Sequence, residues 1–91
     1  HRWGMVNHLY PSDILMEKAR EMGDLLASGP PLVYAAIKEI VREAEALTFQ
    51  DAMNRITKRQ FASVDVLYDS DDQLEGARAF AEKRDPVWKG R

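Results

Sequence analysis

The 91-residue sequence contains no cysteine, so it can form no disulfide framework and can carry out no thiolate chemistry. It has only two histidines, His1 and His8, and both lie near one terminus. A metal site needs clustered histidine, cysteine or carboxylate ligands, and two distant histidines do not supply them. We therefore expect no metal centre.

Other absences exclude further classes of protein. No signal-peptide pattern opens the sequence, and no apolar run approaches the ~20 residues that a membrane helix needs. The five glycines are scattered singly, which excludes a phosphate-binding glycine loop. Ser28 beside Gly29 is interpreted as a helix end rather than a nucleophile, because no histidine is placed to activate it. We expect a soluble, cytoplasmic protein without a membrane partner.

The size of the chain indicates one domain or part of one, with a modest core. The first residue is His1 rather than Met, and strong patterning begins only near Ser12. We therefore expect a piece of something longer, divided into a leading segment over 1–11 and a helical region over 12–91.

Hydrophobic periodicity predicts the first two helices. One helix over about 13–27 has four apolar side chains on one face: Leu15, Ala19, Met22 and Leu26. Ser12 is its expected cap, and the short Gly29 to Pro31 junction ends it. A second helix is expected over about 31–46, with Pro31 in its first turn. The short junction favours antiparallel packing of these two helices.

Two more helices are expected after residue 47. Thr48 is a plausible cap for a third helix whose apolar pattern runs to Tyr68, and its two apolar edges indicate contact with two neighbours. Ser70, with Gln73 three residues later, is the capping box of a fourth helix that should end before Pro86. Residues 3–10 alone cannot make a sheet. The predicted fold class is therefore all-α, with about four amphipathic helices.

One glycine and two glutamates inside the predicted helices allow structural predictions. Gly76 costs up to about 1 kcal/mol relative to alanine within a helix, which predicts close approach of another helix there. Glu39 and Glu43 lie four residues apart, opposite the apolar stripe of their helix. We expect both to be solvated surface charges.

The charge of the chain is unevenly distributed. The net charge is −2, but residues 83–91 carry +3, because four cations face the single acid Asp85: Lys83, Arg84, Lys89 and Arg91. Lys83 and Arg84 suit the negative end of a helix. The other residues are acidic overall and no helix is basic along one face, so we expect no nucleic-acid partner.

The run EGARAFAEKRDPVWKGR, residues 75–91, resembles the C-terminal signature of the crotonase superfamily, the enoyl-CoA hydratase and isomerase group. GMVNHLYP at 4–11 is similar to that family's turn after the catalytic core, and SGPPLVYAAIKEIV at 28–41 resembles its Gly-Pro-led helix. The resemblance spans essentially the whole chain. Within the family, the ending FAEKRDPVWKGR is most similar to that of carnitinyl-CoA dehydratases.

The resemblance implies a role for this region. The family's glutamates and oxyanion hole belong to a core that is absent from these 91 residues, and the matched part is the helical region that packs subunits into trimers, commonly paired as hexamers. The resemblance also implies that Phe80 and Lys83 contact the adenosine and phosphate end of coenzyme A, the carrier of the acyl-CoA substrate. It implies no covalently bound cofactor, and it makes Trp88 an anchor.

Two hypotheses follow. The first is the C-terminal part of an acyl-CoA hydratase or dehydratase, which supplies oligomerisation helices and part of the coenzyme A site but is catalytically silent alone. The alternative is a self-standing helical protein-interaction module without enzyme activity. The alternative predicts a stable monomer with little exposed apolar surface.

Overall fold

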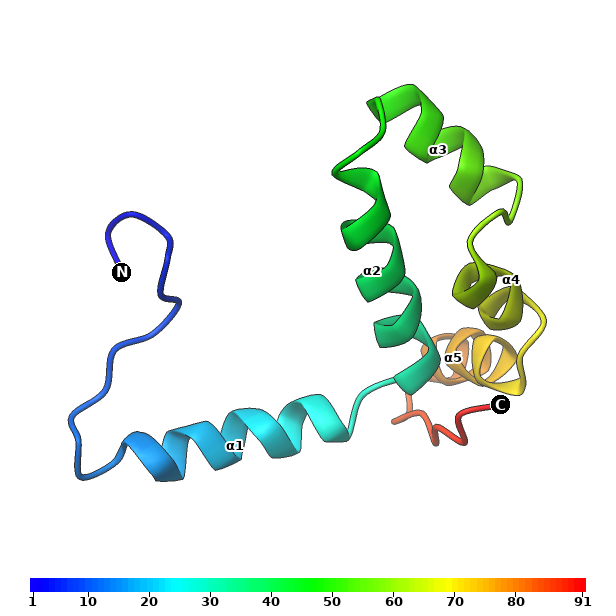
Figure 1. Cartoon of the computed structure of the whole chain (residues 1–91). Coiled ribbons are helices and arrows are strands. Elements are labelled where there is room, and N and C mark those ends of the chain that lie inside the picture. Colours follow the sequence, from blue (N-terminus) through cyan, green and yellow to red (C-terminus); the bar gives the residue numbers. More distant parts are fainter.

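The computed structural model describes residues 1–91, and Figure 1 shows a chain of helices without any strand. The all-α prediction is confirmed. There are five helices rather than about four: α1 Leu15–Ala27, α2 Pro31–Ala44, α3 Phe49–Thr57, α4 Ala62–Tyr68 and α5 Asp71–Glu82. No helix is long and apolar enough to cross a membrane.

Four helices and the C-terminal tail form the body of the molecule. Helix α2 packs on α3 and α4, and α4 packs on α5. The core beneath them consists of Ala36, Phe61 and Val64, and Phe61 is only 1% exposed. Partly buried apolar side chains surround this core: Ile40, Leu47, Ile56 and Leu67. The core is modest, as expected, and smaller than that of a compact chain of this length, because α1 contributes no buried residue to it.

The prediction of a single helix over 48–68 is wrong, because the helix is interrupted between α3 and α4. Arg59 takes a left-handed conformation with φ 53°, and the N–H of Gln60 donates to the carbonyl of Arg55 at 2.8 Å. This bond is the 6→1 contact of a Schellman motif, which closes a helix and reverses the chain. The reversal brings Phe61 into the core, and the burial of a phenyl ring stabilises the break.

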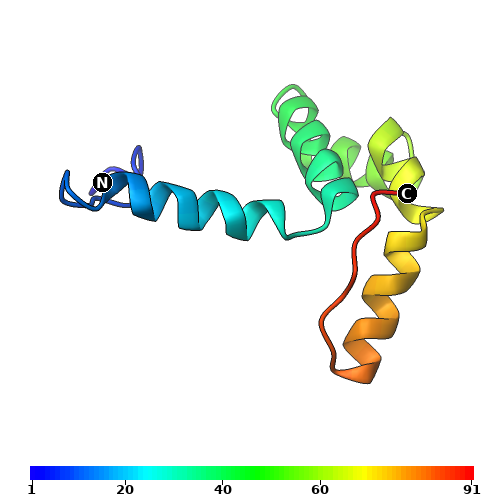
Figure 2. The same ribbon diagram turned by 90° about the horizontal axis from the view of Figure 1, so that it is seen from below.

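Helix α1 projects away from the body in both Figure 1 and Figure 2. None of its residues is buried, so the antiparallel packing expected for the first two helices is wrong. The radius of gyration is 16.7 Å, whereas a compact chain of this length would have about 12 Å. The exposed apolar side chains of α1 are Leu15, Met16, Met22, Leu25 and Leu26.

The helix ends follow the local sequence in part. Thr48 and Ser70 are confirmed as caps, since their hydroxyls accept the N–H groups of Asp51 and Gln73, each at 3.1 Å. The expected cap at Ser12 is wrong, because α1 begins later and has no side-chain cap. Here a turn precedes the helix, in which the N–H of Ile14 donates to the carbonyl of Pro11.

The tail, residues 85–91, returns along α5 toward the beginning of that helix (Figure 2). Trp88 lies over Gly76: a Cβ added to this glycine would be 3.3 Å from Cη2 of the indole ring. The close contact predicted at Gly76 is confirmed, but the tail makes it rather than another helix. The tail and α5 therefore form one packed unit.

Candidate binding site at the end of the last helix

Phe80 and Lys83 lie together where α5 ends. The N–H of Lys83 donates to the carbonyl of Phe80 at 3.4 Å, so the two residues share the last turn. Ala79 is buried against the body, and successive helical residues point about 100° apart, which leaves Phe80 87% exposed. Lys83 is also exposed, and none of the ion pairs involves it. Both side chains are therefore open to a ligand.

The backbone at Lys83 is left-handed, with φ 54°. The helix ends at Glu82, and not just before Pro86 as expected, because the N–H of Arg84 donates to the carbonyl of Ala79 at 3.1 Å in a second Schellman motif. Such a position usually holds glycine, since a Cβ makes the left-handed conformation unfavourable. A lysine here carries a conformational cost.

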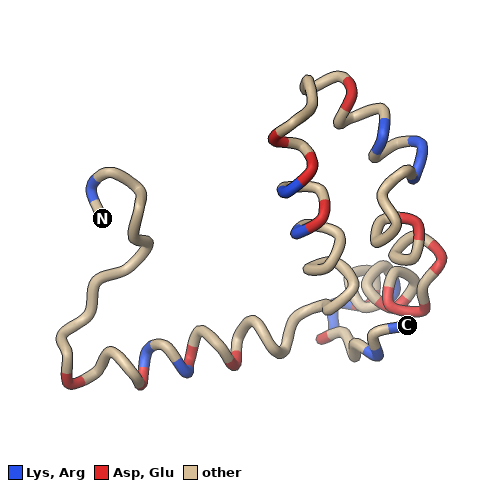
Figure 3. Tube along the Cα trace, in the orientation of Figure 1, with Lys and Arg blue, Asp and Glu red and all other residues tan.

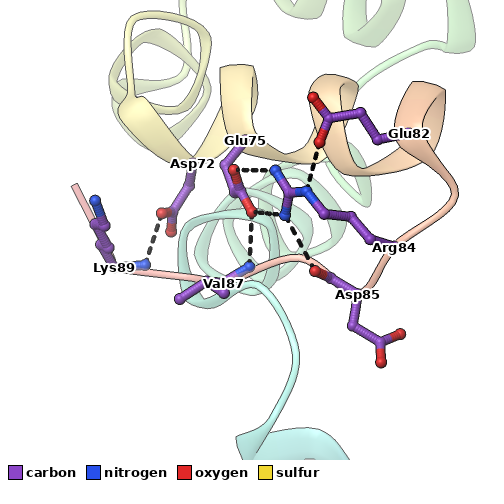
Figure 4. A network of polar contacts seen from close by, with 7 residues as sticks. All are labelled: Asp72, Glu75, Glu82, Arg84, Asp85, Val87 and Lys89. Carbon is purple, nitrogen blue, oxygen red and sulfur yellow. Dashed lines mark hydrogen bonds and ion pairs between the residues drawn. The ribbon is translucent and has the colours of Figure 1, made fainter.

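Arg84 is exposed like Lys83, but unlike Lys83 it is paired with acidic side chains. Its guanidinium donates two hydrogen bonds to Glu75, at 2.6 and 3.0 Å, and one to Glu82 at 2.6 Å (Figure 4). We call these three residues the Arg84 clamp. The guanidinium, together with the N–H of Val87 at 2.9 Å, lowers the pKa of Glu75 to about 2. Lys83 and Arg84 directly follow Glu82, the last helical residue, so both lie at the negative end of α5 as expected.

A second carboxylate holds the far end of the tail. Asp72 is only 3% exposed and accepts the N–H groups of Lys89 at 2.7 Å and Gly90 at 2.8 Å. Its own N–H donates to the carbonyl of Arg91 at 3.2 Å. The sequence did not reveal this role of Asp72. The contact spans seventeen residues to Lys89, and no local pattern signals it.

The cations of residues 83–91 lie among acidic residues around the C-terminal end of the chain (Figure 3). Arg84 is paired with acids, and Arg91 lies 3.7 Å from Asp71 in an exposed pair. Lys89 is bonded through its backbone to Asp72 near the start of α5, whereas Lys83 lies at its end. The charge that remains for a ligand beside Phe80 is therefore that of Lys83.

Glu39 has a structural partner that the sequence did not reveal. Its carboxylate accepts the N–H groups of Ala62 at 3.3 Å and Ser63 at 2.8 Å, and also the Ser63 hydroxyl. The bonds from Ser63 lower the pKa of Glu39 below its ordinary value of 4.5. The solvated role expected for Glu39 is wrong: it caps the N-terminus of α4 from α2. Glu43 is exposed and pairs with Arg55 at 3.1 Å.

No group of three or more histidine, aspartate or glutamate side chains is arranged to hold a metal ion. The groove beside the tail, of about 300 Å³, is mostly apolar and is lined by residues of α2, α4, α5 and the tail. Trp88 and Gly76 form part of its wall. This groove offers an apolar surface next to the tail.

Comparison with known proteins identifies relatives of the whole chain. The family model described as enoyl-CoA hydratase/isomerase matches residues 1–91. A carnitinyl-CoA dehydratase of Salmonella heidelberg is 43% identical over 90 residues, which are 99% of this chain and 34% of that protein. A carnitinyl-CoA dehydratase of Citrobacter koseri is 41% identical over the same share of each chain.

Solved structures resemble this chain in shape as well. An enoyl-CoA hydratase from Bacillus anthracis superposes with a TM-score of 0.81 at 29% identity, over 99% of this chain and 33% of its own. A protein described as a short chain enoyl-CoA hydratase, from Novosphingobium aromaticivorans, gives a TM-score of 0.84 at 28% identity over 99% and 34%. The chain thus spans about a third of the length of the relatives that it matches. Its extended shape is also the shape of the matching third in those structures.

Proposed function

Because the chain belongs to the enoyl-CoA hydratase/isomerase family, we propose that it works as the C-terminal third of a crotonase-type acyl-CoA hydratase or dehydratase. The identity to carnitinyl-CoA dehydratases favours a carnitinyl-CoA or enoyl-CoA substrate. In this proposal the chain supplies helices for oligomerisation and one part of the coenzyme A site. The reaction of the whole enzyme is addition or removal of water across the α,β-bond of an acyl-CoA.

The observation that carries the binding role is the state of the two cations at the end of α5. Arg84 is engaged by Glu75 and Glu82, whereas Lys83 has no acidic partner and lies next to an exposed Phe80. An unpaired ammonium suits a phosphate, and an exposed ring offers a face to a nucleobase or its sugar. This combination supports Lys83 and Phe80 as contacts for the nucleotide end of coenzyme A.

Titration of the 91-residue chain with coenzyme A, followed by ¹H–¹⁵N NMR, tests this site. We expect the largest shift changes around Phe80 and Lys83, and a loss of affinity of roughly two- to five-fold in Lys83→Asn, as for an exposed charge contact. Lys38→Asn is the matched control, since it removes the same charge from α2. Equal affinity in Lys83→Asn and the unsubstituted chain would contradict the assignment of this lysine.

The catalytic proposal is that the chain alone does not hydrate acyl-CoA. A general acid at neutral pH needs a raised pKa, but Glu39 and Glu75 have lowered ones and both are engaged in structural hydrogen bonds. We expect no hydration of crotonyl-CoA by the purified chain, measured by loss of the absorbance of the double bond conjugated with the thioester. Measurable hydration above the buffer rate would contradict the proposal.

The oligomerisation role draws on α1, whose apolar side chains remain exposed. An amphipathic helix with an uncovered apolar face favours association, and the family forms trimers commonly paired as hexamers. This exposure supports the first hypothesis over a self-standing interaction module. Static light scattering over a range of concentrations separates the two, because a module would remain a monomer and an oligomerisation region would self-associate.

A further inference from the structure

At the end of α5 a lysine occupies a backbone position that favours glycine. Lys83 has φ 54° and yet closes α5 without a side-chain partner of its own. Residues in such sparsely populated conformations persist only where their surroundings determine them, and they are concentrated at functional sites. The surroundings here are the Arg84 clamp.

Helix geometry shows that the clamp requires the left-handed residue. If α5 continued as a regular helix, Arg84 would lie nine residues after Glu75, about 13.5 Å along the axis and on the opposite face. The guanidinium nevertheless makes two hydrogen bonds to Glu75, at 2.6 and 3.0 Å. Only a reversal of the chain before Arg84 permits both bonds, and the reversal occurs at Lys83.

The clamp is braced from the tail side as well. One oxygen of Glu75 also accepts the N–H of Val87 at 2.9 Å, and the guanidinium donates to the carbonyl of Asp85 at 3.1 Å (Figure 4). The carboxylate of Glu75 therefore joins the residue after Lys83 to the start of the tail. These bonds fix the backbone on the C-terminal side of Lys83, while α5 fixes it on the N-terminal side.

We propose that Glu75 and Arg84 are positioning residues that hold Lys83 in its left-handed conformation and so direct its ammonium toward a phosphate of coenzyme A. This role rests on the proposed function, since it presumes that Lys83 meets the ligand. Glu75 and Arg84 do not touch the ligand in this proposal. The lowered pKa of Glu75 is consistent with a clamp that stays intact at neutral and mildly acidic pH.

The test uses the 91-residue chain and two measurements. The first is the backbone conformation at Lys83, from ¹³C chemical shifts, in the unsubstituted chain and in Glu75→Gln. The second is the affinity for coenzyme A and its dependence on salt, which reports the charge contact with phosphate. Glu43→Gln is the matched control, because it removes an exposed carboxylate that pairs with Arg55 and does not touch α5.

We expect Glu75→Gln to shift Lys83 out of the left-handed region, to weaken coenzyme A binding by roughly the same factor as Lys83→Asn, and to reduce the salt dependence. The double variant Glu75→Gln/Lys83→Asn should bind coenzyme A no more weakly than Lys83→Asn alone, because both substitutions remove the same contact with phosphate. Arg84→Lys should give an intermediate loss, since a lysine keeps the charge without the fork of the guanidinium. Glu43→Gln should change neither measurement.

The failures are distinguishable. If Lys83 keeps its conformation in Glu75→Gln, or if the losses in the double variant multiply, the positioning role is wrong. If the conformation changes but the affinity does not, the positioning role is also wrong, provided that Lys83→Asn alone weakens binding. If Lys83→Asn itself leaves the affinity unchanged, the proposed contact of Lys83 with coenzyme A fails instead, and the conformational result stands by itself.

Discussion

The effect of Gly76→Ala on the free energy of unfolding should depend on residue 88: the substitution should destabilise the chain with Trp88 and stabilise it in Trp88→Phe. Gly76 lies inside α5, where alanine is favoured over glycine by about 1 kcal/mol. The Cβ of that alanine would be 3.3 Å from Cη2 and 3.4 Å from Cζ3 of Trp88, closer than the 3.5–4.0 Å at which carbon atoms attract most strongly. The indole ring would have to move by a few tenths of an ångström.

The tail leaves the ring little room to move. The backbone before Trp88 is held by Glu75 through Val87, and the backbone after it is held by Asp72 through Lys89 and Gly90. Overpacking of a constrained site costs typically about 1–3 kcal/mol. After the helix gain of about 1 kcal/mol is subtracted, we expect Gly76→Ala to destabilise the chain by on the order of 1 kcal/mol.

The matched background is Trp88→Phe, because a phenyl ring lacks the Cη2 and Cζ3 atoms that meet the new methyl group. There Gly76→Ala should stabilise the chain by about 1 kcal/mol, which is a shift of roughly 4–8 °C in Tm for a domain of this size. Urea and thermal unfolding followed by circular dichroism measure all four chains of the cycle. A full gain in the Trp88 background would show that the ring is not held against Gly76, and would refute this reasoning.

Three further predictions use single substitutions. Phe61→Ala should destabilise the chain by about 3–5 kcal/mol, whereas Phe49→Ala, at a residue that is 80% exposed, should change urea unfolding little. Because hydrogen bonds hold the pKa of Glu39 below 4.5, its contribution to stability is present above that pH and is lost as pH falls through the lowered pKa. Glu39→Gln should therefore reduce the fall of Tm at acidic pH. Part of that fall should remain, because Glu75, with a pKa of about 2, also loses its contribution to stability at acidic pH. Lys83→Gly should raise stability by on the order of 1 kcal/mol in the same unfolding assay, since glycine takes the left-handed conformation without strain; a loss would show that the lysine side chain stabilises the fold.

Sequence reasoning predicted those elements whose signals are local. The start of α2 at Pro31 and the caps at Thr48 and Ser70 depend on residues within one turn of the helix end, and the structure has all three. The contact at Gly76 was also predictable, because an internal glycine lowers helix stability and a neighbour must compensate. The identity of the neighbour was not, since Trp88 approaches through a reversal of the chain.

The missed features share a physical cause. Arg59 and Lys83 end their helices in left-handed conformations without glycine, so the usual sequence signal for a C-cap is missing. Glu39 caps α4 from a helix that lies more than twenty residues earlier. Helix α1 has a regular amphipathic pattern, and such a pattern predicts a buried face without stating what covers it. Periodicity reports on a helix, but not on its partner.

The ending of the chain is better understood as one set of mutual contacts than as a row of separate motif positions. Glu75 bonds to Arg84 and to the tail, and Gly76 admits Trp88 against the helix. Each of these contacts needs the reversal at Lys83, because a straight helix would carry residues 84–91 away from α5. The spacing between the Glu-Gly pair and the Lys-Arg pair is therefore set by geometry: insertion of one residue between them would turn Glu75 by about 100° away from Arg84 and break the clamp. Coenzyme A binding and tail packing should then be lost together, whereas an insertion after Gly90 should leave both unchanged.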